Sequence, residues 1–381
     1  KGGKVIWAEN AEDALREVMA ICREKQCRTI VKSKSMVTEE IHLNDFLEQN
    51  GIESVETDLG EYIQQLDHEP PYHIVTPAMH KSKEDIAKLF HEKLHSAPGL
   101  SPAELTLVAR EKMRSKYLEA TIGITGANFV IAETGSIAIT ENEGNGRLSC
   151  SFPKTHIVIT GIEKVIPSLT DLALFWPLLS TFGTGQRVTS YNTIVSGPKQ
   201  AGEYDGPEEM YVILLDNGRT NLLSNIKVRE SLYCIRCGAC LNACPVYKNI
   251  GGHAYGSTYS GPIGAVITPH LKGMKQWNHL SYASSLCGNC TAVCPVKINL
   301  HEILLENRHE AVTEGDAGRM EKLAWRGWKQ ASLHRKWMNM GNYKMKNWVI
   351  NRMFKGWTRE RADLLFPEKT FNQRWRESRE G

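Results

Sequence analysis

Seven of the chain's ten cysteines fall into two short runs, and their spacing constrains the fold more than any other feature. The first run has the spacing Cys-x₂-Cys-x₂-Cys-x₃-Cys-Pro, and the second has the spacing Cys-x₂-Cys-x₃-Cys-Pro. Their members are Cys234, Cys237, Cys240 and Cys244 in the first run and Cys287, Cys290 and Cys294 in the second. Such spacing lets one tight turn of chain present three thiolates to a single centre, and thiolates are the ligands of iron–sulfur clusters. The two runs therefore predict an iron–sulfur protein.

The crossed ligand rule of two-cluster proteins assigns the seven thiols. In this rule the fourth cysteine of each run ligates the cluster of the other run. The rule gives Cys234, Cys237, Cys240 and Cys294 for the first cluster, a [4Fe–4S] centre, and Cys244, Cys287 and Cys290 for the second. The missing fourth position of the second set falls on Ser284. We therefore expect the second cluster to be a [3Fe–4S] centre, or a [4Fe–4S] centre with a non-cysteine fourth ligand.

A zinc knuckle is the structural alternative, because it also uses Cys-x₂-Cys pairs. Zinc needs four ligands per ion in separate groups. Two runs that divide three plus one and end in Cys-Pro fit that need poorly, so iron–sulfur clusters are the favoured interpretation.

Length and hydropathy place the chain among multidomain proteins. Its 381 residues exceed the length of a ferredoxin and predict two or three domains. The longest strongly apolar run, Leu172 to Leu179, is broken by Pro177 and too short to span a bilayer. No secretory signal is recognisable, and an opening Lys1 in place of methionine indicates a missing N-terminal piece. The three remaining cysteines are scattered, which predicts inert thiols in a reducing, cytoplasmic setting: Cys22, Cys27 and Cys150.

The C-terminal tail is basic and rich in tryptophan. From Ala317 to Gly381 it carries 16 Lys or Arg against 6 Asp or Glu, a net charge of +10, and six of the nine tryptophans. Trp and Arg are the residues that anchor interfaces, so the tail predicts a docking surface for a partner subunit. The alternatives are a helical extension that packs its aromatic side chains on the cluster domain, and contact with nucleic acid or membrane lipid.

Upstream of the cysteines, strand-like and helix-like segments alternate, which predicts a mostly parallel sheet covered by helices on both faces. Strands are expected at 4–7, 28–32, 54–57, 73–76, 122–125, 129–132, 136–140, 156–160 and 210–215. Helices are expected after the first strand, with Ala14, Leu15, Val18 and Met19 on one face, and near 36–49, 83–95, 102–120 and 168–182.

Two segments at predicted strand ends are candidate binding sites, because ligands of open α/β sheets gather there. Ser33-Lys34-Ser35 suits an anion at a helix start, although ordinary capping by serine is the favoured explanation. The segment Gly123 to Arg147 combines tight turns, carboxylates and an arginine that suits a carboxylate ligand, although hairpin turns alone account for most of it. Neither segment is a P-loop or a dinucleotide fingerprint, and the sequence offers no convincing Ser-His-Asp arrangement.

Further segments carry a resemblance to a known family. They are Ile122 to Arg147, Gly251 to Gly256, and Gly261 to Val266. Together with the two cysteine runs, these segments resemble the lactate utilisation protein B family from about Lys32 to His301.

The resemblance implies three parts and a function. Residues 1–224 would form a LUD α/β domain, similar to sugar-phosphate isomerases and CoA-transferase-like proteins. Residues 225–310 would form an α-helical two-cluster ferredoxin-type domain, and residues 311–381 a helical basic extension. The implied role is that of an iron–sulfur electron carrier in bacterial oxidation of L-lactate to pyruvate, in a complex with companion subunits. The resemblance assigns the seven cysteines as cluster ligands and leaves the catalytic residues unknown.

Two functional interpretations follow. In the first, the chain is an electron-transfer subunit that passes electrons singly through two clusters. In the second, the LUD domain binds and oxidises a hydroxy- or keto-acid, and the open second cluster is its Lewis acid or electron acceptor. His253, Tyr255 and Tyr259 are candidates to line such a site, although each is more often a packed side chain. A nucleic-acid-processing protein is the weakest alternative, and we expect no nucleic-acid partner.

Overall fold

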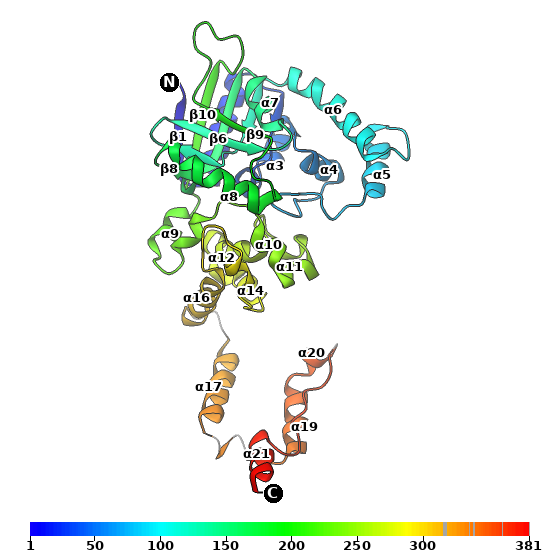
Figure 1. Ribbon diagram of the computed structural model, residues 1–381, viewed down its shortest axis with the longest axis vertical. Helices are drawn as coiled ribbons and strands as arrows, with labels where there is room; N and C mark the ends of the chain where they lie inside the picture. Colours follow the sequence, from blue (N-terminus) through cyan, green and yellow to red (C-terminus); the bar gives the residue numbers. More distant parts are fainter. Residues whose placement is uncertain (315–317, 335, 338–339, 360, 381) are drawn as a thin grey trace. The chain divides into compact units, whose positions relative to one another are not determined.

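The computed structural model describes residues 1–314, 318–334, 336–337, 340–359 and 361–380. The chain forms two compact units, Lys1–Thr313 and Glu314–Gly381. In the first unit an α/β region is followed by a helical region that carries both cysteine runs (Figure 1). The second unit contains α17 (Arg319–Leu333), α19 (Tyr343–Met353), α20 (Lys355–Thr358) and α21 (Phe371–Glu380).

A six-stranded sheet forms the centre of the α/β region, and all five of its strand pairings are parallel. In spatial order its strands are β1 (Lys4–Ala8), β10 (Glu209–Leu215), β7 (Thr155–Gly161), β4 (Ile122–Thr125), β2 (Thr29–Lys32) and β3 (Glu53–Glu56). Every residue of β7 is buried, as expected of a strand covered on both faces. The predicted parallel sheet is therefore confirmed.

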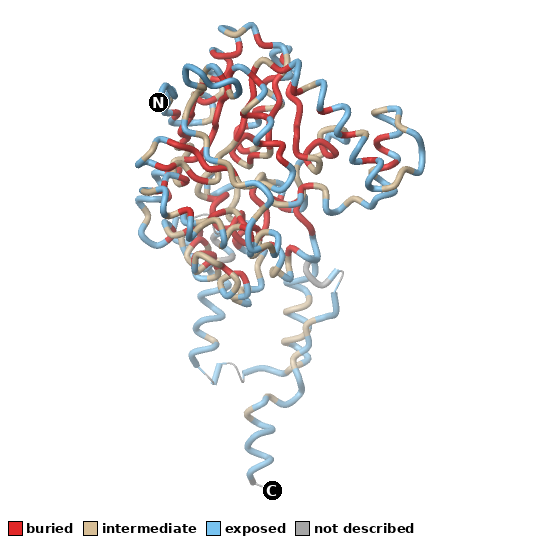
Figure 2. The backbone as a smooth tube through the Cα atoms, turned by 45° about the horizontal axis from the view of Figure 1, so that its top comes forward, coloured by how far each residue is buried: buried red, intermediate tan, exposed pale blue. Residues whose placement is uncertain are grey.

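A second sheet of four strands has mixed pairing, and the sequence did not predict it as a separate layer. Its strands are β8 (Val165–Ile166), β5 (Phe129–Ile131), β6 (Ser136–Glu141) and β9 (Tyr191–Val195). Buried residues concentrate in the inner strands β10, β7 and β4 of the six-stranded sheet and in the helical region, whereas the edge strands β1 and β9 are largely exposed or intermediate (Figure 2).

The helices of the α/β region largely follow the predictions. They are α1 (Ala11–Glu24), α2 (Met36–Glu40), α3 (Leu43–Gln49), α4 (Leu59–Asp67), α5 (Lys83–Leu94), α6 (Pro102–Glu119), α7 (Asn145–Ser151) and α8 (Leu172–Thr184). The single helix expected over 36–49 is wrong, because His42 adopts a left-handed φ of 53° and separates α2 from α3.

The strand expected over 73–76 is also wrong. The His73 Nδ1 accepts hydrogen bonds from the backbone N–H groups of Val75 and Thr76, at 3.1 and 3.2 Å. These donors are the groups that a strand would use for its ladder, so the segment forms a turn.

Short helices build the region that carries the cysteines. They are α9 (Arg219–Ser224), α10 (Ala239–Ala243), α11 (Pro245–Ile250), α12 (Gly261–Lys272), α13 (Met274–Trp277), α14 (His279–Tyr282), α15 (Asn289–Ala292) and α16 (Leu300–Thr313). Buried side chains of α12 and α16 form its core with Cys290 and Cys294. Within the described part of the chain, no helix has the length and apolarity needed to cross a membrane.

A close backbone contact joins the helical region to the α/β region. The Tyr247 hydroxyl donates to the backbone oxygen of Tyr72 at 2.7 Å, and a Cβ on Gly252 would lie 1.7 Å from the same oxygen. His253 Nε2 lies 2.8 Å from the Pro70 oxygen and its ring contacts Tyr72. The structure thus gives His253 a packing role at this junction.

Candidate iron–sulfur centres and the adjoining cavity

The first cysteine run forms a tight loop around Cys237. The residues on either side of it, Arg236 and Gly238, have left-handed φ angles of 61° and 79°. The chain then enters α10, which ends before Cys244. Left-handed residues on both sides of one cysteine reverse the chain sharply, which brings cysteines that are three residues apart to one side of the loop.

The second run repeats this backbone, residue for residue, at an offset of 50 positions. Leu286 and Gly288 flank Cys287 with φ angles of 53° and 78°, as Arg236 and Gly238 flank Cys237. The helix α15 then takes the place of α10. Two loops of the same conformation in one core are the arrangement that a two-cluster protein needs.

Ser284 occupies the position in the second run that Cys234 occupies in the first. The Ser284 Oγ accepts a hydrogen bond from the Leu286 N–H at 3.2 Å, and the Cys234 Sγ accepts one from the Arg236 N–H at 3.4 Å. The hydroxyl therefore lies where the first run has a thiol. The second set has three cysteines and this serine.

The thiols influence one another in two groups. Burial raises the pKa of Cys237 to about 11, and the Cys234 and Cys294 thiols contribute to this increase. Burial also raises the pKa of Cys290, with contributions from Cys244 and Cys287.

These two groups of neighbouring thiols are the same as the two ligand sets that the crossed rule gives. Burial raises the pKa of Cys240 well above its usual value. Cys234 and Cys237 of its own group contribute to this increase, and so does Cys290 of the other group. Ionising so many neighbouring buried thiols is costly unless metal ions compensate the charge. The donor set therefore fits iron–sulfur clusters, while the ligand of each iron stays a prediction.

The surroundings of the two runs differ. Cys237 is 7% exposed, and its neighbour Gly238 lies against His73 of the α/β region, where an added Cβ would be 3.1 Å from the His73 Cε1. Cys287 is exposed and lines a shallow surface recess with Lys248 and Asn289. One candidate cluster is enclosed between the two regions, and the other reaches the surface.

A cavity of about 530 Å³ adjoins the first run. It lies at the carboxyl ends of β2, β3, β4 and β7, where ligands of parallel sheets bind. Its lining includes Lys34, Asp58, Gly126, Thr160, Glu163, Lys164, Ile235, Arg236, Cys237 and Tyr259. Ser284 is not among the lining residues, so the cavity adjoins the first cluster position and not the open corner of the second.

A buried ion-pair network forms the wall behind the first run. Arg219 donates from Nη2 to Glu40 at 2.8 Å and from Nε to Glu163 at 2.6 Å, and its side chain is 2% exposed. The Tyr259 hydroxyl donates to the same Glu40 carboxylate. Burial alone would raise the pKa of Glu40 and Glu163, but the charge of Arg219 lowers both below the usual value. Arg219 thus ties α9 to α2 and to the end of β7.

Two more cations lie at the same end of the cavity. Lys164 is buried and donates to the Cys234 backbone oxygen at 2.8 Å. Burial, and then the neighbouring charge of Arg236, lower the pKa of Lys164 to about 8. The Arg236 guanidinium lies over the Tyr259 ring at 4.5 Å, and its buried Nη1 has no hydrogen-bond partner within the described part of the chain.

The segment Ser33-Lys34-Ser35 lines the cavity and also caps a helix. The Ser35 Oγ accepts from the Thr38 N–H at 3.4 Å, which confirms capping. The Lys34 Nζ lies 3.3 Å from the Asp58 carboxylate and donates to the Val75 oxygen, so its charge is already compensated. An anion site at this segment is therefore not favoured.

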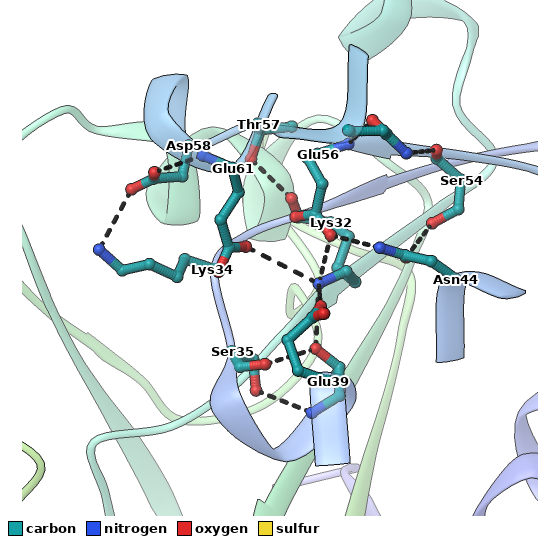
Figure 3. A network of polar contacts seen from close by, with 12 residues as sticks. Lys32, Lys34, Ser35, Glu39, Asn44, Ser54, Glu56, Thr57, Asp58 and Glu61 are labelled. Atoms are coloured by element: carbon teal, nitrogen blue, oxygen red, sulfur yellow. Dashed lines mark hydrogen bonds and ion pairs between the residues drawn. The ribbon is translucent and has the colours of Figure 1, made fainter. Parts of the chain in front are cut away.

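A second lysine, Lys32, organises the strand ends beside this segment (Figure 3). Its Nζ is fully buried and lies 2.6 Å from Glu56, 3.2 Å from Glu39 and 4.0 Å from Glu61. Burial and the neighbouring Glu56 raise the pKa of Glu61, which favours its protonated form. The network holds β2 and β3 together, and Lys32, Glu39, Glu56 and Glu61 do not line the cavity.

Some residues of the segment Gly123 to Arg147 line the cavity, and others only form turns between strands. Gly126 lines the cavity, and Gly135 makes the turn between β5 and β6 with a φ of 63°. Arg147 is exposed and does not line the cavity, so its expected role in binding a carboxylate is wrong. Besides Lys34, the cavity is lined by the cations Lys164 and Arg236, which the sequence had not singled out.

Two family models match the chain. They are the LUD domain over residues 1–215 and the 4Fe-4S dicluster domain over residues 230–298. Among curated proteins, the lactate utilization protein B of Bacillus velezensis is 50% identical over 344 residues, covering 90% of this chain and 72% of that protein. Its counterpart in Bacillus subtilis is 46% identical over 399 residues, covering 99% of this chain and 83% of the relative. The counterpart in Bacillus licheniformis is 52% identical and covers 85% of this chain and 68% of the relative.

Among solved structures, a DUF162 family protein from Deinococcus radiodurans matches at 15% identity with a TM-score of 0.30. The match covers 56% of this chain and 88% of that one. A similarity of this size is too low to support a functional comparison.

Proposed function

The chain belongs to the lactate utilization protein B family, and on that premise we propose that it is the iron–sulfur electron-transfer subunit of a bacterial L-lactate oxidation system. It receives electrons released when lactate becomes pyruvate and relays them to a further acceptor. A bound iron–sulfur cluster supplies one-electron transfer, and the polypeptide supplies burial, ligands and access.

The observation that carries this proposal is the unequal environment of two loops with the same backbone. Cys237 is buried and lines a cavity, whereas Cys287 is exposed at the surface. A relay needs one end near an electron source and another end that a partner can approach. The first cluster would therefore be the inner end of the relay, and the second cluster the outer end.

The need for companion proteins follows from electron counting. Oxidation of a hydroxy acid removes two electrons at once, while a cluster accepts one. Cofactors such as flavin or nicotinamide bridge this difference, and the sequence carries no dinucleotide fingerprint after a strand. We therefore assign the two-electron step to a companion subunit.

The relay is tested by reduction of the full, anaerobically purified chain. L-Lactate alone should leave the visible absorption of the clusters unchanged, and adding the companion proteins should let lactate bleach it. D-Lactate with the same companions is the control for specificity. Rapid reduction of the isolated chain by L-lactate would contradict the proposal.

A second candidate function is catalysis by the LUD domain itself. It is favoured by one observation: the cavity at the sheet edge includes Cys237 in its lining. In this alternative the electron acceptor beside the substrate would be the first cluster. Reduction of the isolated chain by lactate, with a rate that saturates in lactate, distinguishes this function from the relay.

We also propose that the C-terminal tail docks onto a partner subunit. Five of its tryptophans are at least half exposed: Trp325, Trp328, Trp337, Trp348 and Trp375. The sixth, Trp357, lies outside the described side chains. Exposed tryptophan among basic residues suits an acidic partner surface.

Truncation after Thr313, where the first compact unit ends, tests the tail. The truncated chain should keep its iron content and lose co-purification with the companions. Loss of iron from the truncated chain would make the tail part of the core and exclude the docking role.

A further inference from the structure

The cavity beside the first cysteine run has a positive end. Arg219 is fully engaged with the carboxylates of Glu40 and Glu163, at 2.8 and 2.6 Å. Lys164 and Arg236 remain, and the shortest ion-pair distance to either is 3.7 Å, from the Arg236 Nη2 to Glu163 among the described residues. Arg219, Lys164 and Arg236 are thus three cations beside the two carboxylates Glu40 and Glu163. The other carboxylates that line the cavity have partners of their own: Asp58 lies 3.3 Å from Lys34, Glu143 accepts from the Leu59 N–H, and Glu141 accepts from the Gly146 and Arg147 N–H groups.

A buried cation without a matching anion is costly unless something compensates it. Among the described residues, the buried Arg236 Nη1 has no hydrogen-bond partner, although an arginine fork normally satisfies its donors. The Lys164 Nζ donates to the Cys234 oxygen at 2.8 Å, and an ammonium carries three donors. Both side chains line the same cavity, so an anion there would satisfy donors on both.

We propose that this end of the cavity binds the carboxylate of a small hydroxy- or keto-acid, held by Arg236 and Lys164, and that its occupancy is coupled to the redox state of the first cluster. An arginine fork matches the planar geometry of a carboxylate. The choice of a hydroxy- or keto-acid rests on the proposed function. The anion site itself is inferred from the cavity and the unsatisfied donors of Arg236 and Lys164.

The coupling follows from charge. Arg236 and Cys237 are adjacent in sequence and both line the cavity. An anion bound there disfavours the addition of an electron nearby, because like charges in a low-dielectric site repel. Reduction must then weaken anion binding by the same factor by which the anion hinders reduction. A relay with this coupling would release its product-like anion as it accepts an electron.

The competing explanation is that the two cations only balance the negative charge of the cluster ligands. Lys164 donates to the Cys234 backbone oxygen at 2.8 Å, and Arg236 is two residues from Cys234 in the chain. Under that explanation, replacing either cation shifts the cluster potential, and the wild-type chain binds no acid. Measuring binding and potential on the same variants separates the two explanations.

The test is calorimetric titration of the full anaerobic chain with pyruvate and with L-lactate, in the oxidised and in the dithionite-reduced state. Inorganic phosphate is titrated in parallel to distinguish a carboxylate site from a general oxyanion site. The variants are Arg236→Gln, Lys164→Gln and Arg236→Lys, which keeps the charge and loses the fork. Lys248→Gln, beside Cys287, is the matched control. Iron content is measured first, so that only variants with intact clusters are compared.

The proposal predicts saturable binding of one acid per oxidised chain and weaker binding after reduction. Binding should be about tenfold weaker in Arg236→Gln and Lys164→Gln, partly restored in Arg236→Lys, and unchanged in Lys248→Gln. The bound acid should also lower the potential of one cluster.

Three results would overturn the proposal: absence of saturable binding in both redox states, equal binding in Arg236→Gln, or a preference for phosphate. A potential shift in Arg236→Gln without binding by the wild type assigns the cations to the cluster alone. Binding needs no companion protein, so its failure leaves the relay untouched. Failure of companion-dependent reduction likewise leaves the binding result standing.

Discussion

The two cysteine runs have the same backbone and opposite surroundings. Both place left-handed residues around the second cysteine position, Cys237 in one run and Cys287 in the other. The first run faces the carboxyl edge of a parallel sheet and a charged cavity, whereas the second run exposes Cys287 to solvent and buries Cys290 and Cys294. The comparison teaches that the loop conformation determines where thiols converge, whereas the neighbouring region determines what each metal centre can exchange electrons with.

Removing one thiol from each run should give the largest effects, and unequal ones. Cys237→Ala removes a buried ligand that also packs with Phe129 and Ile166, so the first cluster should be lost and the unit destabilised. Cys287→Ala removes an exposed thiol, so the fold should survive with only the second cluster altered.

Iron analysis and thermal unfolding measure this difference. We expect roughly half the iron to remain in each variant, and a clearly lower unfolding temperature only in Cys237→Ala. Equal destabilisation of the two variants would show that the runs do not differ in the way their burial indicates.

The next largest difference should be the stability cost of breaking a buried ion pair behind the first run and an exposed ion pair elsewhere. Arg219→Met removes the hydrogen-bonded cation that Glu40 and Glu163 share and leaves Arg236, at 3.7 Å, beside Glu163 alone, so it should cost about 3–5 kcal/mol of the free energy of unfolding. Lys227→Met removes a more exposed pair with Glu306 and should cost about 0–1 kcal/mol. Chemical denaturation of the anaerobic chains measures both values. A cost for Arg219→Met no larger than for the control would mean that the network behind the first run contributes little.

Gly238 and Gly288 occupy equivalent positions in the two runs, so replacing each by alanine tests how closely the neighbouring region packs against each run. Gly238→Ala and Gly288→Ala introduce the same left-handed strain, of about 1 kcal/mol. A Cβ at Gly238 would also lie 3.1 Å from His73 and Val75, whereas nothing lies within 4 Å of one at Gly288.

Gly238→Ala should therefore be more destabilising than Gly288→Ala by about 1 kcal/mol or more. Thermal unfolding of the two variants side by side gives the difference. Equal stabilities would indicate that the first run is not pressed against the α/β region.

Exchanging the first residue of each run should have the smallest effect on stability and a clear effect on the clusters. Ser284→Cys restores a four-cysteine set in the second run, and Cys234→Ser removes one from the first. Iron per chain should reach about eight in Ser284→Cys. Cys234→Ser should change only the EPR signal of the first cluster, and Ser284→Cys only that of the second. Identical EPR spectra for the two variants would contradict the ligand assignment.

Much of the sheet could be predicted from the sequence, because buried parallel strands appear as short apolar runs with β-branched residues. Two errors came from single residues, one through its side chain and one through its backbone conformation. The His73 ring took the backbone donors of an expected strand, and the left-handed His42 broke an expected helix. Neither effect has a signal in hydrophobic periodicity.

Ser33-Lys34-Ser35 and part of Gly123 to Arg147, both singled out from the sequence, do line the cavity, but its two cations Lys164 and Arg236 were beyond prediction for a different reason. Lys164 and Arg236 look like ordinary charged residues, and only the tertiary fold brings the end of β7 beside the first cysteine run. A signal did exist, since Lys164 follows a predicted strand at its carboxyl end. Arg147 was favoured instead because it stands among glycines, yet it is exposed in the structure.

The central claim is that the chain holds two clusters in different environments, one with four cysteines and one with three cysteines and Ser284. EPR spin quantitation during stepwise anaerobic reduction of the full chain tests it most directly. The account predicts two spin systems with different potentials, of which only one changes in Ser284→Cys. A single spin system with only about four irons per chain would contradict it.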